Sequence, residues 1–306
     1  MSVFSTHIIR SVDDVLETGL KLIRVPLNKK RTKNLEEFRA HYGQNPKVLA
    51  HQWEDLCESG KVTAQETLFK GFQSFMVAHY FLWIYPRNSK NLKSRFPALA
   101  LQDSYGAPLW YWIKKIASLK GQKIVWKARL DDPNAEFFPL SVDGVDFKTH
   151  ERKHQIYNID KKAGSKKFGG ACAAKYEIAC SIWESDVVHV ARPFIGRVHD
   201  LGMFREGGLK EKLAPGKKVV VDRGYRSKDP EEIQCLAVPD LIDSKELHKF
   251  KSRARQRQES LNGRLKNYGI LKHTYRHDYY SHKFVLEAVL VTVQYAMENG
   301  SPLFDV

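Results

Sequence analysis

The chain has 306 residues, 42% of them hydrophobic, and a formal net charge of +15 from 50 Lys and Arg against 35 Asp and Glu. This hydrophobic content supports a substantial core. No stretch approaches the roughly 20 apolar residues of a membrane helix, and the N-terminus lacks the basic start and apolar core of a signal peptide, so we expect a soluble intracellular protein without a membrane partner. The four cysteines lack Cys-x-x-Cys spacing, which argues against a disulfide framework or a zinc ribbon.

The positive charge is concentrated at two places in the chain. Residues 1–120 and residues 245–283 each carry a net charge of +8, whereas residues 121–244 carry only +2. A strong excess of Lys and Arg indicates a polyanionic partner such as nucleic acid. We therefore expect two basic blocks that contact phosphates and a near-neutral centre that is able to hold divalent cations.

The N-terminal part is predicted to be helical. Apolar residues recur at helical spacing over residues 11–84. Residues 89–119 are predicted to form two helices joined by a turn, with Lys114 and Lys115 on the second. That pattern is compatible with a helix-turn-helix whose second helix enters a DNA groove, although any amphipathic helical hairpin looks the same. We predict a helical N-terminal region over residues 1–122, with DNA binding at 89–119 as one of these two interpretations.

From Lys123 onward the apolar pattern becomes that of strands. The predicted strands are 137–147, 155–159, 172–182, 187–194, 217–221 and 235–238. The predicted helices are 201–213, 247–268 and 284–297. Strands followed by mixed strands and helices predict an α/β or α+β sheet domain with helices packed on it, here residues 123–306.

Three acidic residues stand at distinctive places in this second region. Asp143 and Asp222 follow β-branched runs and precede Gly144 and Gly224, which predicts acids at the ends of strands. Glu259 is the only acidic residue between positions 247 and 277, inside a basic predicted helix. Each acid alone has an ordinary explanation, because Asp-Gly is a common turn, Asp222 could cap and Glu259 could pair with a neighbouring arginine. Their combination in a basic protein favours a shared site.

The chemistry that suits three such acids is phosphodiester cleavage by two divalent metal ions, which needs carboxylates converging on a pair of ions about 3.5–4 Å apart. Mg²⁺ prefers a few carboxylates and leaves positions to water and phosphate. In this interpretation Asp143 bridges two Mg²⁺ (or Mn²⁺) ions, and Asp222 and Glu259 each complete one site. Basic residues around them would hold the phosphate backbone. The candidate DNA contacts of the predicted helix are Arg253, Arg255, Arg257, Arg264 and Lys266.

The order of these motifs resembles a known family. Asp143-Gly144, then Gly196-Arg-Val-His199-Asp200, then Asp222-Arg-Gly-Tyr225, then Arg257-Gln-Glu259 with Gly263-Arg-Leu-Lys266, resemble the DDE transposases of the Harbinger type. The resemblance covers roughly residues 80–295. It implies an RNase H-like catalytic domain with Asp143, Asp222 and Glu259 as the catalytic acids and metal ligands.

The resemblance also implies roles for neighbouring residues and partners. His199 and Asp200 belong to a family hallmark, and Asp200 is expected to assist near the site. Asp146 departs from the family pattern and is expected to be a salt-bridge partner rather than an extra metal ligand. Family members act on double-stranded DNA, at transposon terminal repeats and target sites, usually as dimers and in some cases with a Myb-like DNA-binding protein. The expected compartment is the nucleus, or the cytoplasm if the source is bacterial.

The function expected from the sequence is therefore that of a DNA transposase or a transposase-derived endonuclease that cleaves and joins DNA at transposon ends. Two alternatives stay open. A domesticated protein would keep the fold and DNA binding without the activity, and an RNase H-like nuclease would act on RNA or on RNA–DNA hybrids.

Overall fold

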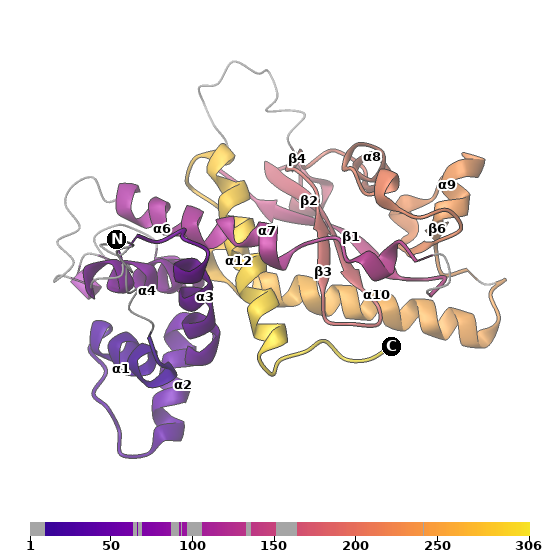
Figure 1. Ribbon diagram of the computed structural model, residues 1–306. Coiled ribbons are helices and arrows are strands. Elements are labelled where there is room, and N and C mark those ends of the chain that lie inside the picture. The colour runs from indigo at the N-terminus through magenta and orange to yellow at the C-terminus, as the bar shows by residue number, and fades with distance from the viewer. Residues whose placement is uncertain are drawn as a thin grey trace, which may run out of the picture. The chain divides into compact units, whose positions relative to one another are not determined.

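A computed structural model describes residues 10–63, 66, 69–86, 92, 94–96, 106–132, 136–150, 164–240 and 242–306 (Figure 1). The chain divides into two compact units. The first runs to Lys120 and also takes in Asn267–Ile270 and Phe284–Gly300. The second comprises Gly121–Lys266, Leu271–Lys283 and Ser301–Val306. The domains predicted at 1–122 and 123–306 stay a prediction.

The first unit is helical, as predicted. Its helices before Lys120 are α1 (Val12–Leu22), α2 (Arg31–Tyr42), α3 (Pro46–Glu58), α4 (Phe69–Ile84) and α6 (Gly106–Ser118). Ser11 begins α1 with a capping box to Asp14, and Asn45 caps α3 in front of a proline at its first position. Much of the first predicted helix of the 89–119 hairpin lies outside the described residues, so the helix-turn-helix stays a prediction.

The core of this unit is aromatic. Trp53 of α3 lies 5.0 Å from Phe72 and 5.6 Å from Trp112, measured between ring centroids. The long helix α12 (Tyr279–Glu298) supplies residues to both units. Among the described helices, none has both the length and the apolar character that crossing a bilayer requires.

The second unit is built on a mixed sheet. Its strands are β1 (Leu140–Lys148), β2 (Ala173–Ser181), β3 (Val187–Val190), β4 (Phe194–Ile195), β5 (Val219–Val220) and β6 (Leu236–Ala237). They are arranged in the order β3-β2-β1-β5-β6, with β4 also paired to β2. The β1–β2 and β2–β3 pairs are antiparallel, and the β1–β5 and β5–β6 pairs are parallel. The predicted mixed α/β sheet is confirmed; the strand predicted at 155–159 lies outside the described residues.

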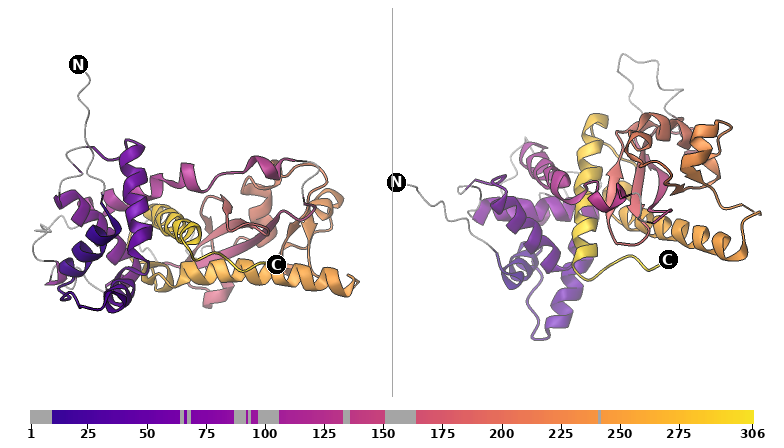
Figure 2. Two further views of the ribbon diagram at one scale, coloured as in Figure 1. Left: turned by 60° about the horizontal axis from the view of Figure 1, so that its bottom comes forward. Right: turned by 45° about the vertical axis from the view of Figure 1, so that its right-hand side comes forward.

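Helices cover both faces of this sheet. The two that matter most are α8 (Asp200–Glu206) and α10 (Lys245–Lys266), and Figure 2 shows α10 running along one face. The remaining short helices of the described chain are α7 (Lys120–Lys123), α9 (Pro230–Cys235), α11 (Gly269–Lys272), η2 (Ala128–Leu130), η3 (Lys166–Phe168), η4 (Lys210–Lys212) and η5 (Arg223–Tyr225).

The strand β5 and the residue after it show why the three residues before Asp222 are all apolar. Val219 and Val221 pack in the cluster that contains Phe204 of α8, whereas Val220 packs with Ala254 of α10. Because successive strand side chains point to opposite faces, a strand covered on both faces needs an unbroken apolar run. The strand and the acid that follows it are thereby held at the centre of the sheet.

Candidate functional site

Two acids reach the same level of the sheet because of strand register. Ser141 of β1 lies opposite Val220 of β5 in a parallel pair. Asp143 and Asp222 each follow two residues later, so they emerge side by side from neighbouring strands. Asp222 also begins η5, and its Oδ1 accepts a hydrogen bond from the Gly224 amide at 2.7 Å.

The third acid comes from α10. Glu259 lines one cavity of about 270 Å³ together with Asp143 and Asp222. The other lining residues are Val142, Gly144, Asp146, Lys167, Lys175, Asp200, Arg255 and Gln258. The side chain of Glu259 is 65% exposed, and its Oε1 lies 3.7 Å from Nη2 of Arg255. The three acids predicted from the sequence therefore open onto the same cavity.

Polar contacts hold α10 against the sheet at this point. Nδ2 of Asn262 donates to Oδ2 of Asp143 at 2.7 Å. One turn earlier, Oε1 of Gln258 accepts from Oγ of Ser141 at 3.2 Å and from Sγ of Cys180 at 3.0 Å. Both amide side chains are buried, and buried polar groups need such partners. They fix the rotation of α10 about its axis, which turns the adjacent Glu259 toward the cavity.

The role of Gln258 was not predicted from the sequence. Gln256, two residues earlier, is by contrast exposed, and Oγ of Ser260 donates to its backbone carbonyl. The available signal was spacing, because Gln258 and Asn262 are four residues apart and lie on the same side of a helix.

Electrostatic repulsion accumulates at Asp143. Burial, together with the nearby carboxylates of Asp222 and Asp200, raises the pKa of Asp143 to about 7. The Gly144 amide and the ammonium of Lys167 act in the opposite direction. Asp143 is therefore a carboxyl group whose charge the surrounding protein leaves incompletely compensated.

The accessory residues divide between the cavity and its surroundings. Asp200 lines the cavity, and its Oδ1 lies 2.7 Å from Nζ of Lys175. Asp146 is 8% exposed and lies opposite Lys175 in the β1–β2 register. Burial raises the pKa of Asp146, and the nearby Lys175 ammonium partly offsets that rise. His199 is exposed, directly before α8, and is not among the cavity-lining residues.

The predicted DNA-contacting arginines fall on different sides of α10. Arg255 lines the cavity. Arg257 instead is only 1% exposed and donates to the backbone carbonyls of Ser181 and Phe304. Its guanidinium is thereby engaged with the protein, so the structure does not present Arg257 as a phosphate contact.

Arg253 and Arg264 also contact the C-terminal segment. Arg253 donates to the carbonyl of Asp305 at 2.5 Å, and Arg264 donates to that of Pro302 at 2.7 Å. Lys266, by contrast, lies near the acids. Burial lowers its pKa, with a further lowering by the neighbouring Lys167, while Asp143 and Asp146 raise it.

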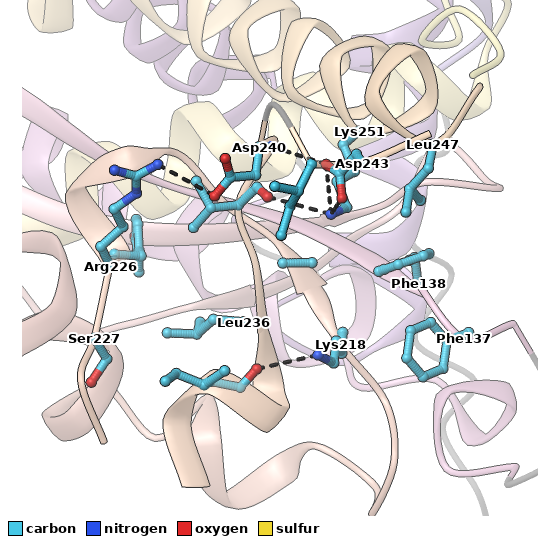
Figure 3. Close-up of a pocket in the computed structure, with 15 residues that line it drawn as sticks. Phe137, Phe138, Lys218, Arg226, Ser227, Leu236, Asp240, Asp243, Leu247 and Lys251 are labelled. Atoms are coloured by element: carbon cyan, nitrogen blue, oxygen red, sulfur yellow. Dashed lines mark hydrogen bonds and ion pairs between the residues drawn. The ribbon is translucent and has the colours of Figure 1, made fainter. Parts of the chain in front are cut away.

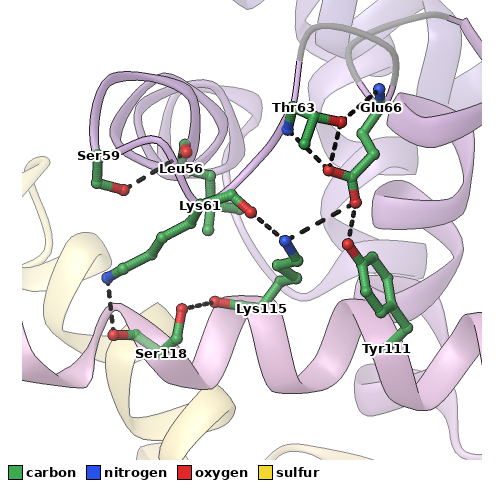
Figure 4. Close-up of polar contacts among 8 residues, drawn as sticks. All are labelled: Leu56, Ser59, Lys61, Thr63, Glu66, Tyr111, Lys115 and Ser118. Atoms are coloured by element: carbon green, nitrogen blue, oxygen red, sulfur yellow. Dashed lines mark hydrogen bonds and ion pairs between the residues drawn. The ribbon is translucent and has the colours of Figure 1, made fainter.

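Of the two lysines of α6 that were predicted to contact DNA, Lys115 is engaged within the first unit (Figure 4). Nζ of Lys115 donates to the carbonyl of Lys61 and lies 3.8 Å from a carboxylate oxygen of Glu66. Nζ of Lys114 lies 5.2 Å above the ring of Phe284. Lys115 therefore contributes to the internal packing of this unit. Lys114 is exposed, and a DNA contact by this residue stays a prediction.

A second and larger cavity, of about 790 Å³, lies elsewhere in the second unit (Figure 3). It is lined by aromatic and aliphatic residues such as Phe137 and Phe138. Both of its carboxylates are paired with a cation, because Lys251 lies 2.8 Å from Asp243 and Arg226 lies 3.6 Å from Asp240. Lys218 adds a third cation to the lining. The smaller cavity, with its group of carboxylates, is therefore the better candidate for phosphodiester chemistry.

The carboxylate oxygens of the smaller cavity are ligands of the kind that divalent cations prefer, but their present spacing is not that of a metal site. Among the described residues, no three Asp, Glu, His or Cys side chains are grouped closely enough to bind one ion as they stand. The carboxylates of Asp143 and Asp222 nevertheless repel each other, and hard oxygen ligands of this kind are those that Mg²⁺ binds. A cation between them would relieve the repulsion that raises the pKa of Asp143.

Comparison with known protein families gives a match over the second half of the chain. A family described as DDE superfamily endonuclease matches residues 142–294, which is half of the chain and includes all three acids. Comparisons with curated proteins and with solved structures gave no match.

Proposed function

The chain belongs to the DDE superfamily endonucleases, and we propose that it is a DNA transposase, or an endonuclease derived from one. It would cleave phosphodiester bonds at transposon ends and join the freed 3′-hydroxyl to target DNA. The observation that carries this proposal is the convergence of Asp143, Asp222 and Glu259 on one cavity.

In this proposal Asp143, Asp222 and Glu259 would hold two Mg²⁺ or Mn²⁺ ions. The chemistry supplied there would be activation of the attacking oxygen and stabilisation of the leaving oxygen in an in-line displacement. The protein's contribution is positioning. Asn262 and the Gly144 amide fix the two oxygens of Asp143, so that this carboxylate keeps its orientation at the cavity.

Basic groups at the cavity would receive the substrate. Arg255 and Lys167 line it, and Lys266 lies close to Lys167. Cations around a cleft of carboxylates attract a phosphate backbone without reading its sequence. The helical first unit would then select the DNA ends.

The test is nicking of supercoiled plasmid DNA in Mg²⁺ or Mn²⁺ by the full chain and two variants, Asp143→Asn and Glu259→Gln. Both variants remove a charge with little change of shape, and we expect each to lower nicking by about a hundredfold or more. Glu206→Gln is the control, because Glu206 is an exposed carboxylate that is paired with Arg192 at 2.9 Å and lies outside the cavity. Equal nicking by the parent chain and the two variants would remove the catalytic assignment.

The same assay separates the alternatives when matched DNA, RNA and hybrid substrates are offered. Cleavage confined to RNA strands would favour an RNase H-like nuclease, and metal-independent DNA binding without cleavage would favour a domesticated protein. We also propose, from the family resemblance, that the protein acts in the nucleus as a homodimer, with a Myb-like protein as a further partner. Size measurement of the DNA-bound protein tests the dimer.

A further inference from the structure

Asp200 occupies a space that two glycines leave open. A Cβ atom placed on Gly144 would lie 2.3 Å from Oδ1 of Asp200, and one placed on Gly224 would lie 2.4 Å from Oδ2. Both distances are far below a normal contact. Each oxygen of Asp200 therefore rests against one glycine, and its carboxylate fills the gap between these two segments of backbone.

These glycines belong to the segments that carry two of the acids. Gly144 directly follows Asp143 in β1, and Gly224 lies two residues after Asp222 in η5. The separation of Asp143 and Asp222 consequently depends on what lies between Gly144 and Gly224. Among the described residues, Asp200 is the one whose side chain comes within 2.4 Å of a Cβ placed on either glycine.

Lys175 holds Asp200 in this gap. Its Nζ lies 2.7 Å from Oδ1 of Asp200 and donates to the carbonyl of Val198 at 3.0 Å. The two paired side chains are only 10% and 22% exposed, so the ion pair is better shielded from solvent than a surface pair. The Cε atom of Lys175 also lies 3.1 Å from the position of a Cβ on Gly144. The lysine therefore crosses over Gly144 on its way from β2 to Asp200.

We propose that Lys175 and Asp200 form a positioning pair that sets the separation of Asp143 and Asp222, and that Asp200 is not itself a metal ligand. An ammonium group 2.7 Å from a carboxylate oxygen competes with a cation for that oxygen. The proposal rests on the proposed endonuclease function, because it concerns the same acids, and it assigns to Lys175 a role that the motif pattern alone did not indicate.

The first experiment tests whether Asp200 fills the space between Gly144 and Gly224. It measures the thermal unfolding of the full chain and needs neither metal nor DNA. Gly144→Ala is chosen because its other close neighbours, Cε of Met203 and Cε of Lys175, are the ends of flexible side chains. We expect Gly144→Ala to lower Tm by roughly 5 °C or more, and to lower it by less than half as much in an Asp200→Ala background. An equal loss in both backgrounds, or failure to fold in both, overturns the proposal; folding only in the Asp200→Ala background supports it.

The second experiment measures the consequence for the acids. Relative to the parent chain, Lys175→Met is expected to weaken Mn²⁺ binding about tenfold and to lower kcat for plasmid nicking by about tenfold or more, with little change in KM. Lys175→Arg keeps the positive charge and should retain part of the Mn²⁺ affinity and part of the kcat that Lys175→Met loses. Lys120→Met is the control, because Lys120 also lies 2.8 Å from a carboxylate oxygen, that of Glu287, but belongs to the other unit.

The stoichiometry of Mn²⁺ binding distinguishes positioning from ligation. Asp200→Asn is expected to weaken binding while leaving the number of bound ions unchanged, and loss of one ion would overturn the proposal. Unchanged Mn²⁺ affinity and unchanged kcat in Lys175→Met would also overturn it while leaving the endonuclease function standing. If the parent chain does not nick DNA, the proposed function fails, and the unfolding comparison of Gly144→Ala still decides the role of Asp200.

Discussion

Single residues of the cavity show how burial and mutual repulsion act on carboxyl groups. Asp143 has a pKa raised to about 7 by burial and by Asp222 and Asp200. A metal ion that binds there near neutral pH must displace a proton from part of the molecules, so metal binding is coupled to proton release.

Deeper in the same unit, Glu177 of β2 lies opposite Gly144 and is fully buried.

Glu177 gives a prediction about pH and stability. Burial, with the nearby carboxylates of Asp200 and Glu211, raises the pKa of Glu177 from 4.5 to about 8, although the Tyr225 hydroxyl acts in the opposite direction. The folded chain thus binds this proton more tightly than the unfolded chain does, so the Glu177 contribution favours folding below pH 4.5 and is lost as the pH rises toward about 8. We expect Glu177→Gln to stabilise the protein at pH 8 by about 1–3 kcal/mol and to have little effect at pH 5.

Urea unfolding of both proteins between pH 5 and pH 8 measures this difference. Glu184→Gln is the control, since the Glu184 side chain is 56% exposed. The same dependence of stability on pH in the parent chain and in Glu177→Gln would contradict the prediction.

At the scale of elements, α10 has one side that faces the cavity and another that contacts the C-terminal residues 301–306. Its sequence does not show which residues belong to which side. Its basic residues repeat so densely that nearly every face carries one, and the apolar stripe alone leaves the rotation of the helix undetermined. The rotation of α10 is set by two groups of contacts. Arginines of the helix bind backbone carbonyls of residues 301–306, and Gln258 binds Ser141 and Cys180 of the sheet. Both groups join residues that are remote in sequence. Arg257 consequently lies inside the protein, whereas Arg255, two residues earlier, lies at the cavity.

The difference between these two arginines is testable. Arg257→Ala removes hydrogen bonds to the buried carbonyl of Ser181 and to that of Phe304, and we expect it to destabilise the chain by about 2–4 kcal/mol. Arg255→Ala should change stability by less than about 0.5 kcal/mol and weaken DNA binding. Urea unfolding and DNA binding by filter retention measure the two effects. Normal stability of Arg257→Ala together with a loss of DNA affinity equal to that of Arg255→Ala would contradict this assignment.

The acids themselves could be predicted because each has a local signal. Asp222 follows the apolar run of β5, as predicted, whereas Asp143 precedes a glycine inside β1 and not at the predicted strand end. The parallel register of β1 and β5 brings the two acids together. Glu259 stands alone among cations. The pair of Lys175 and Asp200 could not be predicted, because it depends on the register in which β2 pairs with β1 and on the space that Gly144 leaves, neither of which a one-dimensional pattern contains.

For the whole molecule, the net charge of +15 predicts strongly salt-dependent DNA binding. The logarithm of the binding constant should fall linearly with the logarithm of salt concentration, with a slope of about −0.9 for each phosphate neutralised. Arg255 and Lys266 lie at the cavity acids, so the double variant Arg255→Ala/Lys266→Ala should reduce the magnitude of this slope by roughly 2.

Arg257→Ala removes the same kind of charge from a buried position and serves as the internal comparison, provided that binding is measured where it remains folded. Its slope should match that of the parent chain, because a guanidinium already bound to backbone carbonyls releases no DNA counterion. Filter binding from 50 to 200 mM salt, the range over which such slopes are resolved, measures all three proteins. If the two variants lowered the slope equally per residue, DNA affinity would follow total charge alone, and the division of α10 into a cavity side and a tail side would have no bearing on binding.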